Sequence, residues 1–448
     1  MHSTLLDSRF LGSLFSTPSM RAVFADTAYL DRYTETEIAL AVAEGKLGLI
    51  PADAARAIAD KAPGIELDLP RLERETQNVG YPILPLVHQL SEGLGEAGKY
   101  LHWGATTQDI MDTALVLQIR EGLDLLETDL RGVAVQLRRL SAEHRDTPMA
   151  GRTHLQHALP VTFGLKTAIW LGMMERNLER LQQMRPRVLV GQFAGAGGTL
   201  ASLGSRGLEV QAAMMDELKL GVPITTWHTA RDGLAETAQW LGLVTAALAK
   251  IGLDVSLMMA NELGEVFEPF VQGRGASSTM PQKRNPISCE VMIAAAKTVR
   301  HLAGLALDGA VQDFERATGP WQAEWVALPE AFLHTAGSVS QALFMLTGLE
   351  VDARRMQKNL DSTGGLIVAE AVMMGLAPAL GRNEAHDVVY AACRTALEEH
   401  LMLADVLKAN PDVTRLVTCA EIDAMCSPNN YLGSASQMVD QMLAAKPH

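Results

Sequence analysis

The sequence is poor in aromatic residues, which make up only 5% of its 448 positions. Aromatic and β-branched residues favour strands, whereas Ala, Leu and Met, which are abundant here, favour helices. A large sheet is therefore excluded, and an all-α fold is expected. The chain is also longer than one compact core usually is, so two or three domains are expected.

Cysteine is scarce as well, with four residues at Cys289, Cys393, Cys419 and Cys426. They form no C-x-x-C pair and have no histidine at the spacing of a zinc site. This pattern indicates reduced thiols in a cytoplasmic protein. No cluster of metal ligands and no phosphate-binding loop occurs in the sequence, so no metal or organic cofactor is implied.

Basic residues are in deficit, with 38 Lys and Arg against 52 Asp and Glu and a net charge of −14. Nucleic acid is therefore not expected as the main partner, although local cations in a cleft still allow an anionic substrate. The N-terminus lacks the basic and then apolar layout of a signal peptide. No apolar run reaches the roughly 18 residues that span a bilayer, so no membrane contact is expected.

Long helical patterns fill the middle of the chain. From about Asp112, apolar residues recur in steps of three and four over about nine helical turns. Four more long helices are predicted to begin near residues 160, 233, 285 and 325. Helices of this length must bury their apolar stripes against each other, which predicts an elongated bundle. We expect helical domains at residues 1–111, 112–351 and 352–448, with the bundle in the central one.

Three polar stretches interrupt these helices, and the first is "HWGATTQDIMDT", residues 102 to 113. Thr106 and Thr107 come directly before a helix. Hydroxyls and free amides at a helix N-terminus form an anion site that suits a carboxylate. The alternative is that one of these threonines is only an N-cap.

The second stretch is "GRTHLQHALPVTFG", residues 151 to 164. It supplies Thr153, His154 and Gln156 in a polar loop before a long helix. A histidine in such a loop can act as a general acid or base near neutral pH. The alternative is a hydrogen-bonded structural histidine.

The third stretch is "GASSTMPQKRNPISCE", residues 275 to 290. Its glycines permit flexing, two prolines bracket Lys283 and Arg284, and Asn285 is expected to cap the next helix. A mobile, cationic loop of this kind can close over a dianionic substrate and exclude water. The alternative is a solvated surface turn.

The three stretches, in this order, resemble the conserved regions of the fumarase/aspartase superfamily. "SSTMPQKRNP" is similar to the superfamily signature S-S-x-M-P-x-K-x-N-P, and "GATTQDIMDT" and "GRTHLQHALPVTFG" resemble its first and second conserved regions. The similarity spans nearly the whole chain. It is greatest to the branch of 3-carboxy-cis,cis-muconate lactonizing enzymes and adenylosuccinate lyases, and "WHTARD", "WQAEW" and "NYLGSA" resemble the lactonizing group.

This resemblance implies a three-domain all-α fold whose central helices form a 20-helix core in a homotetramer. It also implies active sites built from three subunits and a small di- or tricarboxylate substrate. Members of the superfamily remove a proton next to a carboxylate and expel a β leaving group, in most cases releasing fumarate. The lactonizing enzymes instead add a carboxylate across a double bond.

The resemblance also assigns roles to individual residues. Ser277 matches the catalytic base, and loop amides, the following helix and Lys283 are expected to stabilise its alkoxide. His154 matches the general acid of C–N lyases, where lactonizing enzymes tend to carry Trp. Substrate contacts are implied for His102, Thr106, Thr107, Thr153, Gln156, Arg231, Ser278, Met280, Asn285 and Arg316.

Two departures from the family pattern bear on the reaction. Ala276 replaces the usual glycine before the two serines, which restricts the loop slightly. Asn78 and Val79 lie where adenylosuccinate lyase carries a His-Asp pair. The leading hypothesis is therefore a C–N lyase that splits an aspartate-derived or N-succinyl amino acid into fumarate and an amine. The alternatives are a 3-carboxy-cis,cis-muconate cycloisomerase, then adenylosuccinate lyase or a catalytically silent structural relative.

Overall fold

The computed structural model describes residues 4–280 and 282–447. The chain divides into two compact units. The first unit comprises Met1–Leu130, Asn177–Ala249 and Val291–Gln341, and the second comprises Arg131–Arg176, Lys250–Glu290 and Ala342–His448. The three-domain boundaries expected from the sequence stay a prediction.

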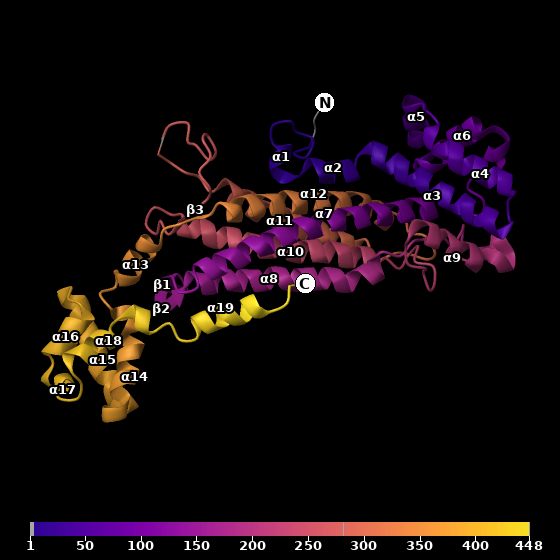
Figure 1. The fold of residues 1–448 in the computed structure, drawn as a ribbon. Helices are drawn as coiled ribbons and strands as arrows, with labels where there is room; N and C mark the ends of the chain where they lie inside the picture. Colours follow the sequence, from indigo (N-terminus) through magenta and orange to yellow (C-terminus); the bar gives the residue numbers. More distant parts are fainter. Residues whose placement is uncertain (1–3, 281, 448) are drawn as a thin grey trace. The chain divides into compact units, whose positions relative to one another are not determined.

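Five long helices account for the bundle pattern, and each has residues in both units. They begin within a few residues of the positions that apolar spacing predicts, so the mainly helical fold is confirmed. The helices are α7 (Thr107–Glu143), α8 (Phe163–Val188), α10 (Asp232–Met258), α11 (Ile287–Asp308) and α12 (Pro320–Thr347) (Figure 1).

Helix α3, as long as α11, and several shorter helices complete the first unit. Thr17 and Asp68 cap two of them with their side chains, and a left-handed Gly48 ends a third. Buried side chains such as Ile58, Leu86 and Leu90 form a core that joins α3, α4, α5 and α6, whereas α9 packs in a second core with part of α3. These helices are α1 (Gly12–Phe15), α2 (Pro18–Val23), α3 (Asp26–Leu47), α4 (Ala52–Lys61), α5 (Leu69–Val79), α6 (Ile83–Leu94) and α9 (Gly207–Leu218).

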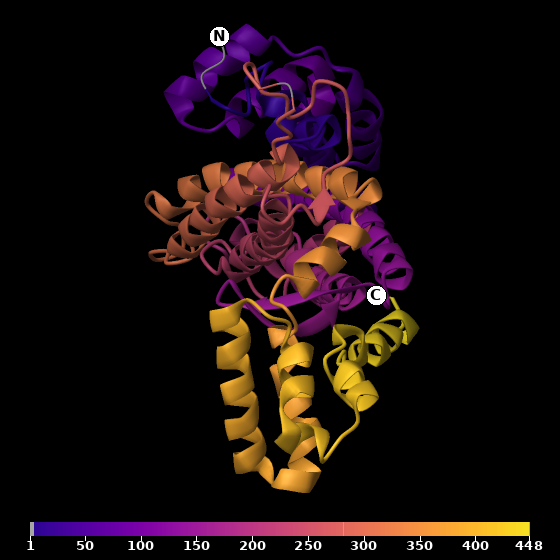
Figure 2. The same cartoon turned by 90° about the vertical axis from the view of Figure 1, so that its left-hand side faces the viewer.

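The second unit contains a cluster of C-terminal helices around Leu376, Leu403 and Ile422 (Figure 2). A capping box at Thr418 and Glu421 starts one of them. The helices after residue 352 are α13 (Ala353–Asp361), α14 (Ala369–Leu380), α15 (Arg382–Glu399), α16 (Leu403–Ala409), α17 (Pro411–Thr414), α18 (Cys419–Met425) and α19 (Ala435–Ala444).

Two small antiparallel sheets in the second unit depart from the expected all-α fold. β1 (Pro148–Thr153) pairs with β2 (Gln156–Thr162), and β3 (Val266–Phe267) pairs with β4 (Glu350–Val351). The expected polar loop around His154 is therefore a β-hairpin. Its two turn residues, His154 and Leu155, both have positive φ angles of 51° and 65°. This combination is typical of the two-residue turns that match the twist of paired strands.

Helix α10 departs from the expectation that no apolar stretch of the chain is long enough to span a bilayer. By length and composition alone it could cross a membrane, although core helices of soluble proteins meet the same criteria. Less than half of its most apolar stretch is buried within the chain.

Candidate active site

The N-terminus of α7 in the first unit holds the first conserved stretch. The Thr106 amide donates to Asp109 Oδ2, and the Asp109 amide donates to the Thr106 carbonyl, both at 3.0 Å. The Thr106 hydroxyl accepts a hydrogen bond from Arg316 Nη1 at 3.2 Å instead of capping an amide. Asp109 therefore supplies the cap, and the threonine hydroxyl faces a cation.

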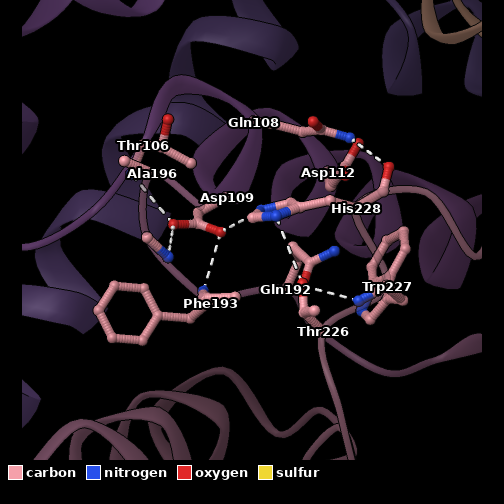
Figure 3. A network of polar contacts seen from close by, with 12 residues as sticks. Thr106, Gln108, Asp109, Asp112, Gln192, Phe193, Ala196, Thr226, Trp227 and His228 are labelled. Carbon is pink, nitrogen blue, oxygen red and sulfur yellow. Dashed lines mark hydrogen bonds and ion pairs between the residues drawn. The ribbon is translucent and has the colours of Figure 1, made fainter. Parts of the chain in front are cut away.

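Asp109 is fully buried and joins this helix terminus to two other segments (Figure 3). Its Oδ1 accepts from the Ala194 amide at 2.9 Å and from His228 Nε2 at 2.7 Å, and its Oδ2 accepts from the Gly195 amide at 2.9 Å. These donors offset the cost of burying a carboxylate. His228 Nδ1 lies 3.3 Å from the Thr226 hydroxyl, which can donate to it. The network fixes the loop around residue 195 against α7.

Arg316 is the exposed cation of this region. Besides Thr106 it donates to Gln108 Oε1 at 3.1 Å and to the Ala196 carbonyl at 3.2 Å. All three acceptors are neutral, so the guanidinium keeps its net charge. A positive group beside a hydroxyl and a helix N-terminus is suited to a carboxylate.

Arg231, in contrast, is buried and forms two ion pairs. It donates to both oxygens of Asp112 at 2.5 and 2.8 Å and to Glu324, with a shortest distance of 2.6 Å. Burial raises the pKa of Glu324, although Arg231 opposes this effect. This placement favours a structural role for Arg231 over the substrate contact expected from the sequence.

The second conserved stretch lies at the tip of the hairpin in the second unit. Thr153, His154 and Gln156 are exposed there. Arg152 anchors the hairpin through two bonds to the buried Glu265, at 2.6 and 2.9 Å. Within the described part of the chain, no hydrogen bond to the His154 imidazole is present. The alternative of a hydrogen-bonded structural histidine therefore gains no support.

The third stretch forms a loop in the second unit that carries Ser277. The Ser277 hydroxyl oxygen accepts from the Met280 amide at 3.1 Å and from the Thr279 amide at 3.3 Å. Backbone donors aimed at one oxygen stabilise negative charge on it. This geometry agrees with the loop amides expected around the Ser277 alkoxide. Ser278 and Met280 are exposed on the same loop.

The loop is closed at its base. The Gly275 carbonyl accepts from both the amide and the side chain of Asn285, at 3.1 and 2.9 Å. Gly275 has φ of 69°, and a Cβ there would lie 2.7 Å from the Asn285 carbonyl oxygen, so glycine is required. Lys283 and Asn285 line a cavity of about 170 Å³ next to this base. Arg284 pairs with Glu350 at 3.0 Å.

The helix that follows the loop is capped differently from the sequence expectation. α11 begins at Ile287, and the buried Glu268 carboxylate accepts from the Ser288 amide at 3.1 Å and from the Cys289 amide at 2.9 Å. Because α11 begins at Ile287 and Glu268 takes the amides of its first turn, the expected N-cap role of Asn285 is wrong. A carboxylate already occupies this helix terminus, so its amides are not open to an external anion.

The candidate residues thus fall into two groups. His102, Thr106, Thr107 and Arg316 belong to the first unit, and the hairpin tip and the Ser277 loop belong to the second. Sequence reasoning missed Asp109, His228 and Glu268. Asp109 and His228 lie 119 positions apart, and no local pattern connects them.

Comparisons with known proteins identify the family of this chain. The family described as "Lyase" matches residues 15–300, and "Adenylosuccinate lyase C-terminus" matches residues 365–442. The chain therefore belongs to the fumarase/aspartase superfamily of lyases. Within the superfamily it lies in the branch of the 3-carboxy-cis,cis-muconate lactonizing enzymes and adenylosuccinate lyases.

Individual relatives cover nearly the whole chain. A 3-carboxy-cis,cis-muconate cycloisomerase of Pseudomonas aeruginosa is 46% identical, with 98% of this chain and 96% of the relative aligned. An N-acetyl-S-(2-succino)cysteine lyase of Dickeya dadantii is 39% identical over 99% and 98% of the two chains. The crystal structure of a fumarate lyase from Mesorhizobium sp. BNC1 is 53% identical, with a TM-score of 0.92 over 96% of this chain and 99% of the other.

Proposed function

We propose that this protein is a C–N lyase that cleaves an aspartate-derived or N-succinyl amino acid and releases fumarate. The observation that carries the proposal is the Ser277 oxygen, which accepts two backbone N–H groups at 3.1 and 3.3 Å. A serine is a weak base unless its alkoxide is stabilised, and these donors supply that stabilisation.

In this mechanism, Ser277 removes the proton from the carbon next to one carboxylate. Negative charge then moves onto that carboxylate, where Arg316 and the Thr106 hydroxyl can bind it. As the double bond of fumarate forms, the bond to nitrogen breaks. His154, exposed at the hairpin tip, gives the departing nitrogen a proton.

A homotetramer with active sites shared by three subunits is part of the proposal. Apolar side chains are exposed along the five long helices, and half-buried helices of this kind bury such surface against a partner. The exposed residues include Val135 on α7, Ile169 on α8, Leu243 and Leu253 on α10, Leu307 on α11 and Val326 on α12. A partner chain of the same sequence would cover them and bring the two groups of candidate residues together.

A 3-carboxy-cis,cis-muconate cycloisomerase is the second candidate. The relatives at 40 to 46% identity that carry this name favour it. His154 favours elimination, because an amine leaving group requires a proton whereas lactone formation releases no such group. The name of the Dickeya dadantii relative attaches its succino group to sulfur, so a thioether substrate also belongs among those tested.

The test offers the purified protein iminodisuccinate, adenylosuccinate, N-acetyl-S-(2-succino)cysteine and 3-carboxy-cis,cis-muconate, and follows the ultraviolet absorbance of fumarate or of the diene. Fumarate release from a nitrogen-linked substrate, abolished by Ser277→Ala, is the expected result. Ser434→Ala is the matched control, since that exposed serine makes no capping bond. Turnover of 3-carboxy-cis,cis-muconate alone would overturn the proposal.

A further inference from the structure

Helix α3 carries two carboxylates inside the first unit. Glu37 is 1% exposed and Glu44 is 0% exposed. They lie seven residues apart, which is about two turns, so both are on the same face of the helix. A buried carboxylate is costly unless another group compensates it, and the two residues differ in this respect.

Glu37 has a specific partner, the imidazole of His102. The distance from Glu37 Oε1 to His102 Nδ1 is 2.6 Å. His102 precedes α7 by five residues and has a φ of 60°, in the left-handed region that non-glycine residues rarely adopt. Such a conformation persists only where the surroundings impose it. The short contact to Glu37 is one of the interactions that impose it.

The charges around His102 favour its protonated form. Burial by itself lowers the pKa of the imidazole, but Glu37 on α3 outweighs it, with a further contribution from Asp109 on α7, so the pKa is raised. Glu44, also on α3, supplies no compensating charge, because burial, and secondly the charge of Glu37, raise the pKa of the Glu44 carboxyl to about 8. His102 is therefore the cation that compensates the buried Glu37.

We propose that Glu37 is a positioning residue: it fixes His102 through Nδ1 and keeps the imidazole protonated, so that Nε2–H can be donated to a substrate carboxylate. The part that concerns the substrate rests on the proposed function. Glu37 itself is buried, touches His102 and has no access to substrate.

The first experiment measures the pair without substrate. The His102 signal is assigned in ¹³Cε1-histidine NMR spectra by its loss in His102→Gln, and its pKa is read from a pH titration. Glu37→Gln should lower that pKa by about one unit or more, because an opposite charge at this distance shifts a pKa by roughly one to three units. Glu35→Gln, a change on the same helix at a half-buried residue paired with Arg32, should leave that pKa unchanged.

The second experiment measures function through fumarate binding by calorimetry and, where a substrate is turned over, through kcat/KM against pH. An imidazolium that binds a carboxylate loses this role as pH rises through its pKa. The alkaline fall of affinity should therefore move to lower pH in Glu37→Gln and stay in place in Glu35→Gln. Glu37→Asp keeps the charge in the same environment and should restore most of the wild-type profile.

Two results would overturn the inference: a Glu37→Gln protein with an unchanged His102 pKa, or one with an unchanged alkaline limb. If Glu37→Gln does not fold, His102→Gln decides. Loss of the alkaline limb in His102→Gln supports the inference, and an alkaline limb at the wild-type pH refutes it. A wild-type protein that turns over no candidate substrate would count against the proposed function alone, because the NMR titration needs no substrate.

Discussion

Glu44 provides a direct test of the buried electrostatics of α3. Its side chain is 0% exposed, and among the residues that the structure describes neither carboxylate oxygen has a hydrogen-bond partner. Burial, and secondly the charge of Glu37, raise the pKa of Glu44 from 4.5 to about 8. We expect Glu44→Gln, a neutral replacement of nearly the same shape, to stabilise the protein at neutral and alkaline pH.

The sign and size follow from proton linkage. Below pH 4.5 both the folded and the unfolded state hold the Glu44 proton, so the substitution has little effect there. Between pH 4.5 and about 8 only the folded state holds it, so the free energy of unfolding falls by about 1.4 kcal/mol per pH unit. At pH 7.5 the accumulated loss over three units is about 4 kcal/mol. Glu44→Gln removes this loss.

The assay is urea unfolding, followed by tryptophan fluorescence at pH 5, 6, 7 and 8 and at one fixed protomer concentration. The stability gap between Glu44→Gln and wild type should widen steadily with pH. Glu35→Gln changes a half-buried carboxylate of the same helix that is paired with Arg32, and its stability gap to wild type should stay small and flat with pH. A Glu44→Gln gap that is constant, or that narrows as pH rises, would refute the reasoning.

Three further predictions concern the candidate active site. Arg316→Lys should raise the KM for a dicarboxylate about tenfold or more, because a lysine cannot reproduce the three donors of the guanidinium group. Steady-state kinetics at fixed ionic strength measures this KM. Asp109→Asn should lower the stability by about 3 kcal/mol, because one remaining acceptor oxygen cannot pair His228 and three backbone amides. An unchanged midpoint of urea unfolding would show that the network is unimportant for stability. His154→Gln should lower kcat by roughly 10²- to 10⁴-fold with little change in KM. An equal loss of kcat for substrates with amine leaving groups and for substrates with better leaving groups would exclude His154 as the general acid.

The long helices were predictable because their apolar spacing is local information. The hairpin at residues 148–162 was not, since its strands carry no clear alternation and its turn depends on two residues in the left-handed region, neither of them glycine. The cap of α11 was also missed, because Glu268 lies 20 positions before the amide it accepts from. The hairpin thus escaped prediction because its local signal is weak, and the cap of α11 because it depends on a contact distant in sequence.

The candidate cations show the same limit, because sequence identifies an arginine but not the charge that surrounds it. Arg231 was an expected substrate contact, yet its charge is neutralised by ion pairs with Asp112 and Glu324. The charge of Arg284, next to Lys283 in the signature, is likewise neutralised by an ion pair with Glu350. Sequence spacing alone could not have separated these residues from those that keep their charge.

The cations that retain net charge are the ones suited to a dianionic substrate. In the first unit Arg316 has only neutral acceptors. In the second, no carboxylate lies within ion-pair distance of Lys283 among the residues the structure describes. His102 differs from both, because its imidazolium is balanced by Glu37 and adds a directed hydrogen bond without net charge. Loss of Arg316 or Lys283 should therefore make dicarboxylate binding less sensitive to salt, since fewer uncompensated charges attract the ligand. Loss of His102 should instead weaken dicarboxylate binding by a similar factor at low and high ionic strength.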